Sequence, residues 1–311
     1  MSTLPAPVPS TTAPVWGWVR VRALVLDSVS SAHSRRVYAK ALDDFWDWCE
    51  RSEAGGFTRE TVQRYRAHLE ARGLAASSLN LHMSVLRKLA REAAANGILA
   101  HEAAAGIASV KGSRAKGGRL GVWLTLDQAQ ALLTSPGGES LRSWRDRALL
   151  AVLIGCGLRR SEVATLAFEQ IEQREGRWVL VDVEGKGRRI RSVPMPAWAK
   201  AAVDRWTGAA GIAGGRLFRA LSQKNELGEG LTAQAVYLIV KGYAERLGIA
   251  VAPHDLRRTF AKLAHRGRSP VEQIQLSLGH ESILTTERYL GVRQSLTDAP
   301  CDHLGIQVEN Q

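Results

Sequence analysis

Between about residues 19 and 110, apolar residues recur at steps of three and four positions, which is the period of one face of an α-helix. Thr58 and Gly73 fit the two ends of one such segment, as an N-cap and as a residue just beyond the helix. This pattern predicts four or five short helices that pack into a small bundle. The positions that carry it are Tyr38, Leu42, Phe45, Trp46, Cys49, Val62, Tyr65, Leu69, Leu79, Met83, Leu86, Leu89 and Ala90.

The helical pattern returns in the second part of the chain. Thr125 and Gln128 have the spacing of a capping box, in which an N-cap hydroxyl and the side chain three residues later satisfy backbone N–H groups of the first turn. Ser269 followed by Pro270 is a second start signal, because proline is favoured at the first helical position. Further helices are predicted over residues 144–154 and 232–247.

Two runs with a strand-like composition, residues 178–183 and 189–193, flank a glycine-rich turn. This arrangement predicts an antiparallel hairpin with Lys186 at its tip, between Gly185 and Gly187. The sequence therefore predicts a mainly α protein, in which an N-terminal helical bundle (residues 19–110) precedes a C-terminal mixed α+β domain (residues 122–295) with a small antiparallel sheet.

The remaining segments have the composition of tails and linkers. Residues 1–18 are expected to be a disordered tail, since the first 14 residues hold four of the ten prolines. Trp16 and Trp18 fall in this tail and receive no role. Residues 296–311 are expected to be a C-terminal tail with an apolar stripe, which packs within its own chain or, as the family resemblance described below implies, on a neighbouring one.

Residues 111–121 form a basic linker with four glycines and no acidic residue. The net charge is +3 before this segment, +4 within it and +5 after it, so a third of the total lies in eleven residues. The segment is either a solvated flexible linker or a strap that lies along a phosphate backbone. The cations that would bind DNA are Lys111, Arg114, Lys116 and Arg119.

The composition narrows the class of partner. A net charge of +12 and a pI near 10.1 favour a polyanion, either nucleic acid or an acidic membrane surface. No apolar run approaches the roughly 20 residues that cross a bilayer, and the N-terminus lacks a signal-peptide pattern, so a cytoplasmic protein is expected. The three cysteines are far apart and offer no metal-ligand spacing.

Three cationic side chains are candidates for binding and activating a phosphate. Arg159 falls in a predicted helix-to-helix turn, and Arg159 and Arg257 can each offer a planar fork of N–H donors to a phosphate. Lys186, at the hairpin tip, can protonate a leaving oxygen as a general acid. Each also has a simpler explanation, because most arginines are solvated or ion-paired and a Gly-Lys-Gly tip is usually only a turn.

Two histidines and a tyrosine complete the candidates. His254 lies three residues before Arg257 and shares a helical face with it if a helix begins near Asp255. His280 can donate a hydrogen bond to a phosphate, and Tyr289, nine residues later, can attack it as a nucleophile. The simpler interpretations are structural histidines and a core tyrosine whose hydroxyl reaches water.

The order and spacing of the segments that carry these residues favour the catalytic interpretation over the structural one. The segments resemble, in the same order, the signature of the tyrosine recombinases of the lambda-integrase type. The resemblance covers about residues 122–295, and the preceding bundle resembles the SAM-like core-binding domain of that family. The segments are Gly157-Leu158-Arg159-Arg160-Ser161-Glu162, Gly185-Lys186-Gly187 with Val193-Pro194, His254-Asp255-Leu256-Arg257 with Thr259-Phe260-Ala261, and Leu278-Gly279-His280 through Thr285-Thr286-Glu287-Arg288-Tyr289.

The resemblance implies a role for each matched residue. Tyr289 would be the nucleophile, and Glu162 would support the site structurally. One departure is visible, because the residue after the second arginine is often histidine in this family and is Arg258 here. The implied phosphate-activating set is Arg159, Lys186, His254, Arg257 and His280.

The resemblance also implies the reaction. Tyr289 would attack a phosphodiester of double-stranded DNA to give a 3′-phosphotyrosyl link, and a 5′-hydroxyl of a partner strand would reverse the step. Two such rounds pass through a Holliday junction. The implied enzyme is a homotetramer on two inverted-repeat core sites, associated with the nucleoid, and it needs no metal and no other cofactor.

Three alternatives remain beside the leading hypothesis, which is an integrase of a mobile element. A Xer-type resolvase of chromosome or plasmid multimers shares the domain plan and the motifs. A non-catalytic DNA-binding protein on the same fold would bind DNA with the same salt dependence and differ only in strand cleavage. A metal-dependent hydrolase that uses His254, His265 and His280 lacks the close ligand pairing of such sites.

Overall fold

The computed structural model describes residues 15–113, 122–185 and 187–290, apart from the side chains of Val15, Trp16, His33, Arg288 and Tyr289. The chain divides into two compact units, one that ends at Gly118 and one that begins at Arg119. This division falls inside the predicted basic linker, and most of that linker lies outside the described residues.

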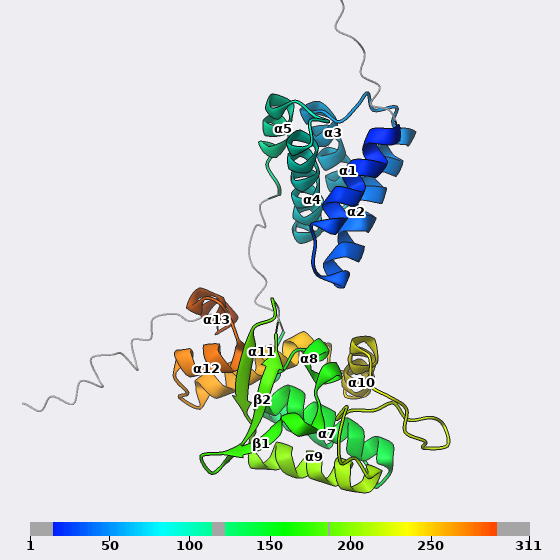
Figure 1. Cartoon of the computed structure of the whole chain (residues 1–311). Coiled ribbons are helices and arrows are strands. Elements are labelled where there is room, and N and C mark those ends of the chain that lie inside the picture. The colour runs from blue at the N-terminus through cyan, green and yellow to red at the C-terminus, as the bar shows by residue number, and fades with distance from the viewer. Residues whose placement is uncertain (1–14, 114–121, 186, 291–311) are drawn as a thin grey trace, which may run out of the picture. The chain divides into compact units, whose positions relative to one another are not determined.

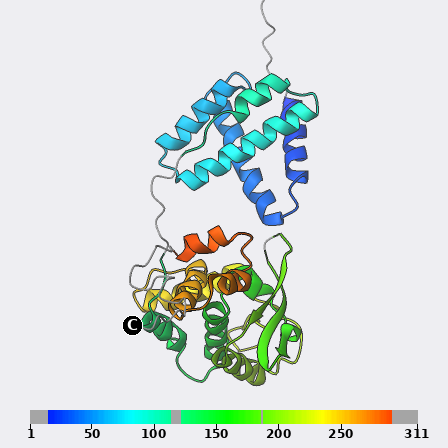
Figure 2. The ribbon, with the colours of Figure 1, turned by 90° about the vertical axis from the view of Figure 1, so that its left-hand side faces the viewer.

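The described part of the first unit is a bundle of five helices (Figures 1 and 2). The long helix α4 contacts each of the other four. The predicted apolar stripes supply the core, in which Leu42, Phe45 and Tyr65 are almost fully buried. The helices are α1 (Val15–Asp27), α2 (Ala32–Arg51), α3 (Arg59–Ala71), α4 (Ala76–Ala95) and α5 (His101–Ala108).

Helix α1 corrects the expected extent of the N-terminal tail. Residues 15–18, which the sequence placed in a disordered tail, belong to this helix. The reason is aromatic packing, because the ring of Trp18 stacks on Trp46 at a centroid distance of 4.7 Å and also lies near Phe45. The prolines that suggested disorder end at Pro14, directly before the helix.

The second unit is mainly helical and holds one small sheet in its described residues. Helix α7 (Leu141–Gly155) is its central element, buried along residues 148–154 and in contact with α6, α8, α9, α10 and α11. Its other helices are α6 (Leu126–Thr134), α8 (Arg160–Thr165), the 3-10 turn η1 (Phe168–Gln170), α9 (Ala197–Ala210), α10 (Ala233–Arg246), α11 (Pro253–Arg266), α12 (Val271–Leu278) and α13 (Ile283–Leu290).

The sheet is antiparallel with the order β1-β2-β3. Strands β2 (Arg177–Glu184) and β3 (Ile190–Pro194) form the predicted hairpin, and β1 (Ile171–Arg174), which the sequence did not suggest, pairs with β2. A bulge between Leu180 and Val183 shifts the register, so that Val183 pairs with Arg191. The expected mainly α fold with a small antiparallel sheet is confirmed.

Most predicted helix boundaries agree with the structure, and one is displaced. Thr58 caps α3, and Thr125 with Gln128 forms the expected capping box of α6. Helix α12 begins at Val271, because Pro270 has an extended ψ of 141° and is the N-cap rather than the first helical residue. Ser269 therefore lies one position too early to cap this helix.

Candidate active site

A tight turn after α7 places Arg159, partly buried, at the start of α8. Gly157 has a φ of +60°, and a Cβ there would lie 2.7 Å from Cδ1 of Phe260 and 3.2 Å from Cδ2 of Leu278. Only glycine combines this backbone conformation with such close packing against α11 and α12. Arg159 follows as the N-cap residue of α8, in the helix-to-helix turn that the sequence predicted.

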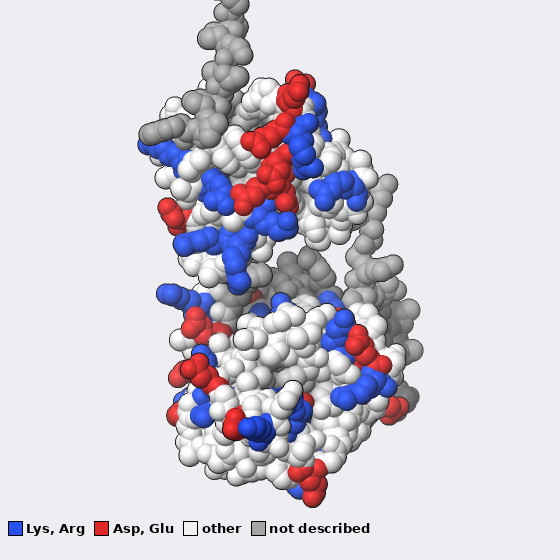
Figure 3. Space-filling model, turned by 90° about the vertical axis from the view of Figure 1, so that its right-hand side faces the viewer, with Lys and Arg blue, Asp and Glu red and all other residues white. Residues whose placement is uncertain are grey.

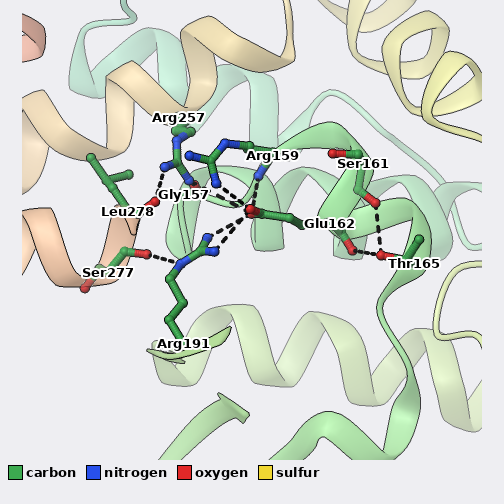
Figure 4. Close-up of polar contacts among 9 residues, drawn as sticks. All are labelled: Gly157, Arg159, Ser161, Glu162, Thr165, Arg191, Arg257, Ser277 and Leu278. Atoms are coloured by element: carbon green, nitrogen blue, oxygen red, sulfur yellow. Dashed lines mark hydrogen bonds and ion pairs between the residues drawn. The ribbon is translucent and has the colours of Figure 1, made fainter. Parts of the chain in front are cut away.

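The buried carboxylate of Glu162 is the centre of the site (Figure 4). It accepts hydrogen bonds from the backbone N–H of Arg159 at 2.8 Å and from Nη1 of Arg159 at 2.6 Å. Arg191 donates to both carboxylate oxygens, from Nη1 at 3.1 Å and from Nη2 at 2.8 Å. Nη1 of Arg257 lies 4.0 Å from Oε2. Three guanidinium groups, from the N-cap of α8, from β3 and from α11, therefore converge on one carboxylate.

Electrostatics keep Glu162 ionised in this position. Its side chain is 2% exposed, and burial alone would raise its pKa. Hydrogen bonds from Arg191 and Arg159, together with the charge of Arg191, outweigh burial and hold the pKa of Glu162 below its ordinary value. One negative charge then faces three positive charges, so the cluster retains a net positive charge that suits an anion.

Arg257 ties the turn after α7 to the end of α12. Its Nη1 donates to the carbonyl oxygen of Gly157 at 2.7 Å, and its Nη2 donates to the carbonyl oxygen of Leu278. The side chain is 1% exposed, whereas that of Arg159 is 27% exposed. Arg257 thus helps to hold two of the four motif segments together, and Arg159 is the more accessible of the two guanidinium groups.

The two candidate histidines share this positive environment. Burial lowers the pKa of His254, and the charges of Arg258 and Arg257 lower it further. Burial, then Arg257 and Arg159, lower the pKa of His280 to about 4. Its Nδ1 lies 2.9 Å from the hydroxyl of Thr286, a fully buried residue of α13. Both imidazoles are therefore neutral at pH 7 in the DNA-free protein, and each can donate one ring N–H.

Arg191 is a residue of this cluster that the sequence analysis did not select. Besides its two bonds to Glu162, its Nε donates to the carbonyl oxygen of Ser277 at 2.8 Å. A Cβ on Gly279, whose φ is +60°, would lie 2.8 Å from Cδ of Arg191. Arg191 therefore joins the hairpin to the turn before His280. Its only signal in the sequence is its position on the predicted strand, five residues after Lys186.

Several predicted site residues lie wholly or partly outside the described residues. Tyr289 belongs to α13 by its backbone, but its side chain is not described. Lys186 is likewise outside the described part, between Gly185 and Gly187 of the hairpin. Lys111 is exposed, whereas the other proposed linker cations, Arg114, Lys116 and Arg119, and the C-terminal segment 296–311 lie outside it.

Within the described ranges no helix is long and apolar enough to span a membrane. Over the same ranges, His, Cys, Asp and Glu side chains form no group of three or more that could hold a metal ion.

Comparison with known families covers both units. Residues 122–295 match the phage integrase family, and residues 21–97 match the N-terminal SAM-like domain of phage integrases. The expected resemblance to recombinases of the lambda-integrase type is confirmed by these matches, and the first of them spans more than half of the chain.

Curated relatives and solved structures agree with this assignment. The chain is 32% identical over 266 residues to a tyrosine recombinase XerC of Pseudomonas fluorescens and 33% identical over 267 residues to a XerC of Stutzerimonas stutzeri. Each alignment covers 83% of this chain and 85% of the relative.

Two DNA-bound recombinases have the same fold at low sequence identity. XerH bound to its difH substrate is 17% identical, with a TM-score of 0.68 over 91% of this chain and 87% of XerH. A lambda integrase dimer bound to a core site is 18% identical, with a TM-score of 0.69 over 88% of this chain and 76% of the integrase. This chain therefore belongs to the phage integrase family and is a site-specific tyrosine recombinase.

Proposed function

We propose that this recombinase cleaves and rejoins double-stranded DNA through a covalent link to Tyr289. The phenol of Tyr289 releases its proton to solvent as its oxygen attacks a backbone phosphorus, an O–P bond forms, and the bond from phosphorus to the 5′-oxygen breaks. The leaving oxygen takes a proton, which Lys186 supplies, and the product is a 3′-phosphotyrosyl link with a free 5′-hydroxyl. Attack of a 5′-hydroxyl from a partner strand reverses these changes and rejoins the DNA.

The surrounding cations stabilise the charge that develops on the phosphate oxygens. Arg159 and Arg257 supply guanidinium groups, and His254 and His280 supply neutral N–H donors. The observation that carries the proposal is the convergence of three guanidinium groups on buried Glu162, because it brings together segments that lie more than 90 residues apart in sequence. Because these groups are already fixed in place, they need little reorientation when charge develops on the phosphate in the transition state.

The reaction as proposed conserves the energy of the phosphodiester bond. One ester replaces another in each step, so strand exchange requires no nucleotide and no external oxidant or reductant. We assign no metal ion and no other cofactor a role in these steps.

The DNA partner is supported by the charge of both units and by the DNA-bound structures of similar fold. On the face of the first unit shown in Figure 3, acidic side chains form a strip and basic side chains lie at several places around it. Along α2 the basic residues Arg35, Arg36 and Lys40 precede the acidic residues Asp43 and Asp44. The basic segments are suited to a DNA backbone, and the linker cations Lys111, Arg114, Lys116 and Arg119 would extend this contact.

The proposed assembly is a homotetramer on two inverted-repeat core sites, acting on DNA of the nucleoid. In it the C-terminal segment, residues 296–311, packs either on its own subunit or on a neighbouring one. The test is the mass of the complex on a DNA duplex with one site and on a synapse with two. Two subunits per site and four per synapse support this assembly, and one subunit per site contradicts it.

The relatives favour a Xer-type role over the mobile-element integrase that led the sequence analysis. The relatives of 28–33% identity are named XerC, and the alignments cover most of both chains. A Xer-type enzyme would resolve chromosome or plasmid multimers at one fixed site. The integrase role differs in the DNA that is cut, since it predicts sites at the ends of a mobile element.

Trapped covalent adducts test the activity and the role together. Purified protein is incubated with genomic DNA of its source, the protein-linked fragments are recovered, and their ends are sequenced. One chromosomal or plasmid locus with an interrupted inverted repeat supports the Xer-type role, whereas element ends support the integrase role. Absence of any adduct, with DNA binding intact, supports the non-catalytic alternative.

A further inference from the structure

Lys262 lies on the same side of α11 as His254, one of the proposed phosphate-binding residues. His254, Arg258 and Lys262 follow one another at four-residue steps, which places them along one side of this helix. Lys262 is partly buried, and neither the resemblance nor the proposed reaction assigns it a role. Its contacts connect α11 to two other segments of the second unit.

The first contact is with the helix that carries Tyr289. The Nζ of Lys262 donates a hydrogen bond to the carbonyl oxygen of Leu290, the last residue of α13. This bond is charge-assisted, because its donor is an ammonium group, and it joins the backbone of α13 directly to a side chain of α11. Leu290 is 2% exposed and packs in a cluster with Ala261 of α11, so the contact lies beside well-packed apolar groups.

The second contact is with the segment that enters this unit. Nζ of Lys262 lies 4.4 Å from the centre of the Trp123 ring, a cation–π geometry. The backbone N–H of Leu124 donates to the hydroxyl of Thr259 at 2.9 Å, and both residues are at most 1% exposed. The entering segment is therefore fixed on α11, and its tryptophan confines the ammonium group that reaches α13.

The environment of Lys262 is unfavourable for a charge that has no specific partner. Burial lowers the pKa of Lys262, and the neighbouring charge of Arg258 lowers it further. A lysine that served only solubility would point into water and avoid this cost. The position of the ammonium group between Trp123 and the end of α13 is thus maintained by those two contacts.

We infer that Lys262 is a positioning residue for the nucleophile. It holds the end of α13 on α11, and α11 carries His254 and Arg257, so it sets where Tyr289 lies relative to the phosphate that these side chains bind. The inference rests on the proposed function of Tyr289. A displacement of about 1 Å at a reacting group can lower a rate roughly a hundredfold, which makes one hydrogen bond at this helix end consequential.

The test compares cleavage rate with DNA affinity in full-length protein. Lys262→Met keeps the length of the stem but removes the charge and the donor. With a nicked duplex that traps the covalent adduct, we expect the rate of adduct formation at saturating DNA to fall roughly tenfold to a hundredfold. The dissociation constant for DNA is expected to change less than about threefold, since a single cation contributes little to total affinity.

Lys200→Met is the matched control. Nζ of Lys200 lies 3.7 Å from the centre of the Trp178 ring and pairs with Asp204, so its loss also removes a cation–π contact and a charged hydrogen bond, here to a carboxylate. It belongs to α9, and these contacts do not reach α13. The adduct rate of Lys200→Met should stay within about twofold of the parent rate. A fall equal to that of Lys262→Met would overturn the inference.

Two further variants separate positioning from folding. Lys262→Arg keeps a charged donor and should recover most of the rate, which a loss of packing alone would not explain. If Lys262→Met failed to fold, Trp123→Leu would decide, because it frees the ammonium group and should lower the adduct rate with the affinity unchanged. Parent-like rates in Lys262→Met, or in Trp123→Leu where that variant decides, overturn the inference.

Tyr289→Phe, run in parallel, distinguishes failure of the inference from failure of the proposed function. If Tyr289→Phe still forms the adduct, the nucleophile has been assigned wrongly and the positioning argument falls with it. If Tyr289→Phe forms no adduct and Lys262→Met reacts at the parent rate, only the role of Lys262 is wrong.

Discussion

The two units of this recombinase bury different kinds of side chain. The described core of the first unit is apolar and aromatic, and its buried polar side chains are Thr61 and His82. The described core of the second unit holds four charged side chains that are each at most 4% exposed: Arg145, Asp146, Glu162 and Arg257. The core of the first unit is therefore stabilised by packing of apolar side chains. The second unit buries ionised side chains, which costs free energy.

This difference shows where the second unit departs from the most stable arrangement. Burial of an ion pair is often no better for stability than well-packed apolar groups of similar size, because the charges lose their hydration. Arg145 and Asp146 pair with each other on α7, and Tyr243 also donates to Asp146 at 3.0 Å. Glu162, in contrast, gathers arginines from three elements of the proposed reaction site. The retained charge there is the charge that the proposed phosphate chemistry requires.

The largest expected effect comes from Arg257→Ala. This change leaves Glu162 with less compensation and removes the donors to the carbonyls of Gly157 and Leu278. Loss of one partner from a buried charge cluster costs about 3–5 kcal/mol. We expect the second unit to lose unfolding free energy of this size, measured by hydrogen exchange of α7 and α11. We also expect no covalent adduct to form. Arg174→Ala, which breaks an exposed pair with Glu172, should change stability by less than about 0.5 kcal/mol.

Arg191→Met should have the next largest effect, on rate more than on affinity. Without its guanidinium, Glu162 loses two hydrogen bonds and the hairpin loses its link to Ser277. We expect adduct formation at saturating DNA to fall about tenfold to a hundredfold, the usual cost of removing a group that orients a reactive one. Arg189→Met is the control just before the same strand, since among the described residues the side chain of Arg189 forms an exposed pair with Glu281. Equal losses in the two variants would remove the special role of Arg191.

A change in the first unit should affect stability alone. Tyr65→Phe removes the buried hydrogen bond between the tyrosine hydroxyl and Nδ1 of His82, whose atoms are 3.1 Å apart. We expect the first unit to lose about 1–2 kcal/mol of unfolding free energy. The adduct rate at saturating DNA should be unchanged, and any drop would show that the core of the first unit also influences the reaction.

The smallest expected effect is a proton uptake on DNA binding. The pKa of His280 is about 4 in the free protein, so His280 is neutral above that pH, whereas the unfolded histidine titrates near 6.5. Stability from this group is therefore lost as pH falls from about 6.5 toward 4. A phosphate beside the imidazole raises its pKa, so binding at pH 5–6 should take up protons. Calorimetry in two buffers measures this uptake, and His280→Asn should reduce it.

Many of the helix boundaries could be predicted from the sequence, because residues close to each boundary determine it. Thr58 caps α3, and Thr125 with Gln128 caps α6, as expected. Each of these caps bonds only to residues within a few positions of itself, so the local sequence is enough to predict it. The tail boundary was wrong, since Trp18 is ordered by its contact with Trp46, nearly thirty residues later. The residues around Trp18 do not show that its ring will stack on a residue so far along the chain.

The role of Arg191 in the site could not be predicted, because it too depends on contacts between distant segments. Arg191 stands in a run of basic residues that includes Arg188 and Arg189, and the sequence does not say which of them points inward. Alternation along β3 places Arg191 on the same side as buried Val193. That this side meets Glu162 and Ser277 depends on how the hairpin packs against α8 and α12, which are distant in sequence.

The identity of the residue that carries the DNA is the most direct test of the central claim. The adduct from a trapped duplex is digested with nuclease and trypsin, and mass spectrometry locates the remaining nucleotide. The account predicts a single modified residue, Tyr289, joined through a 3′-phosphate, with Tyr289→Phe giving no modified peptide. A nucleotide on any other residue, or one joined through a 5′-phosphate, would contradict it.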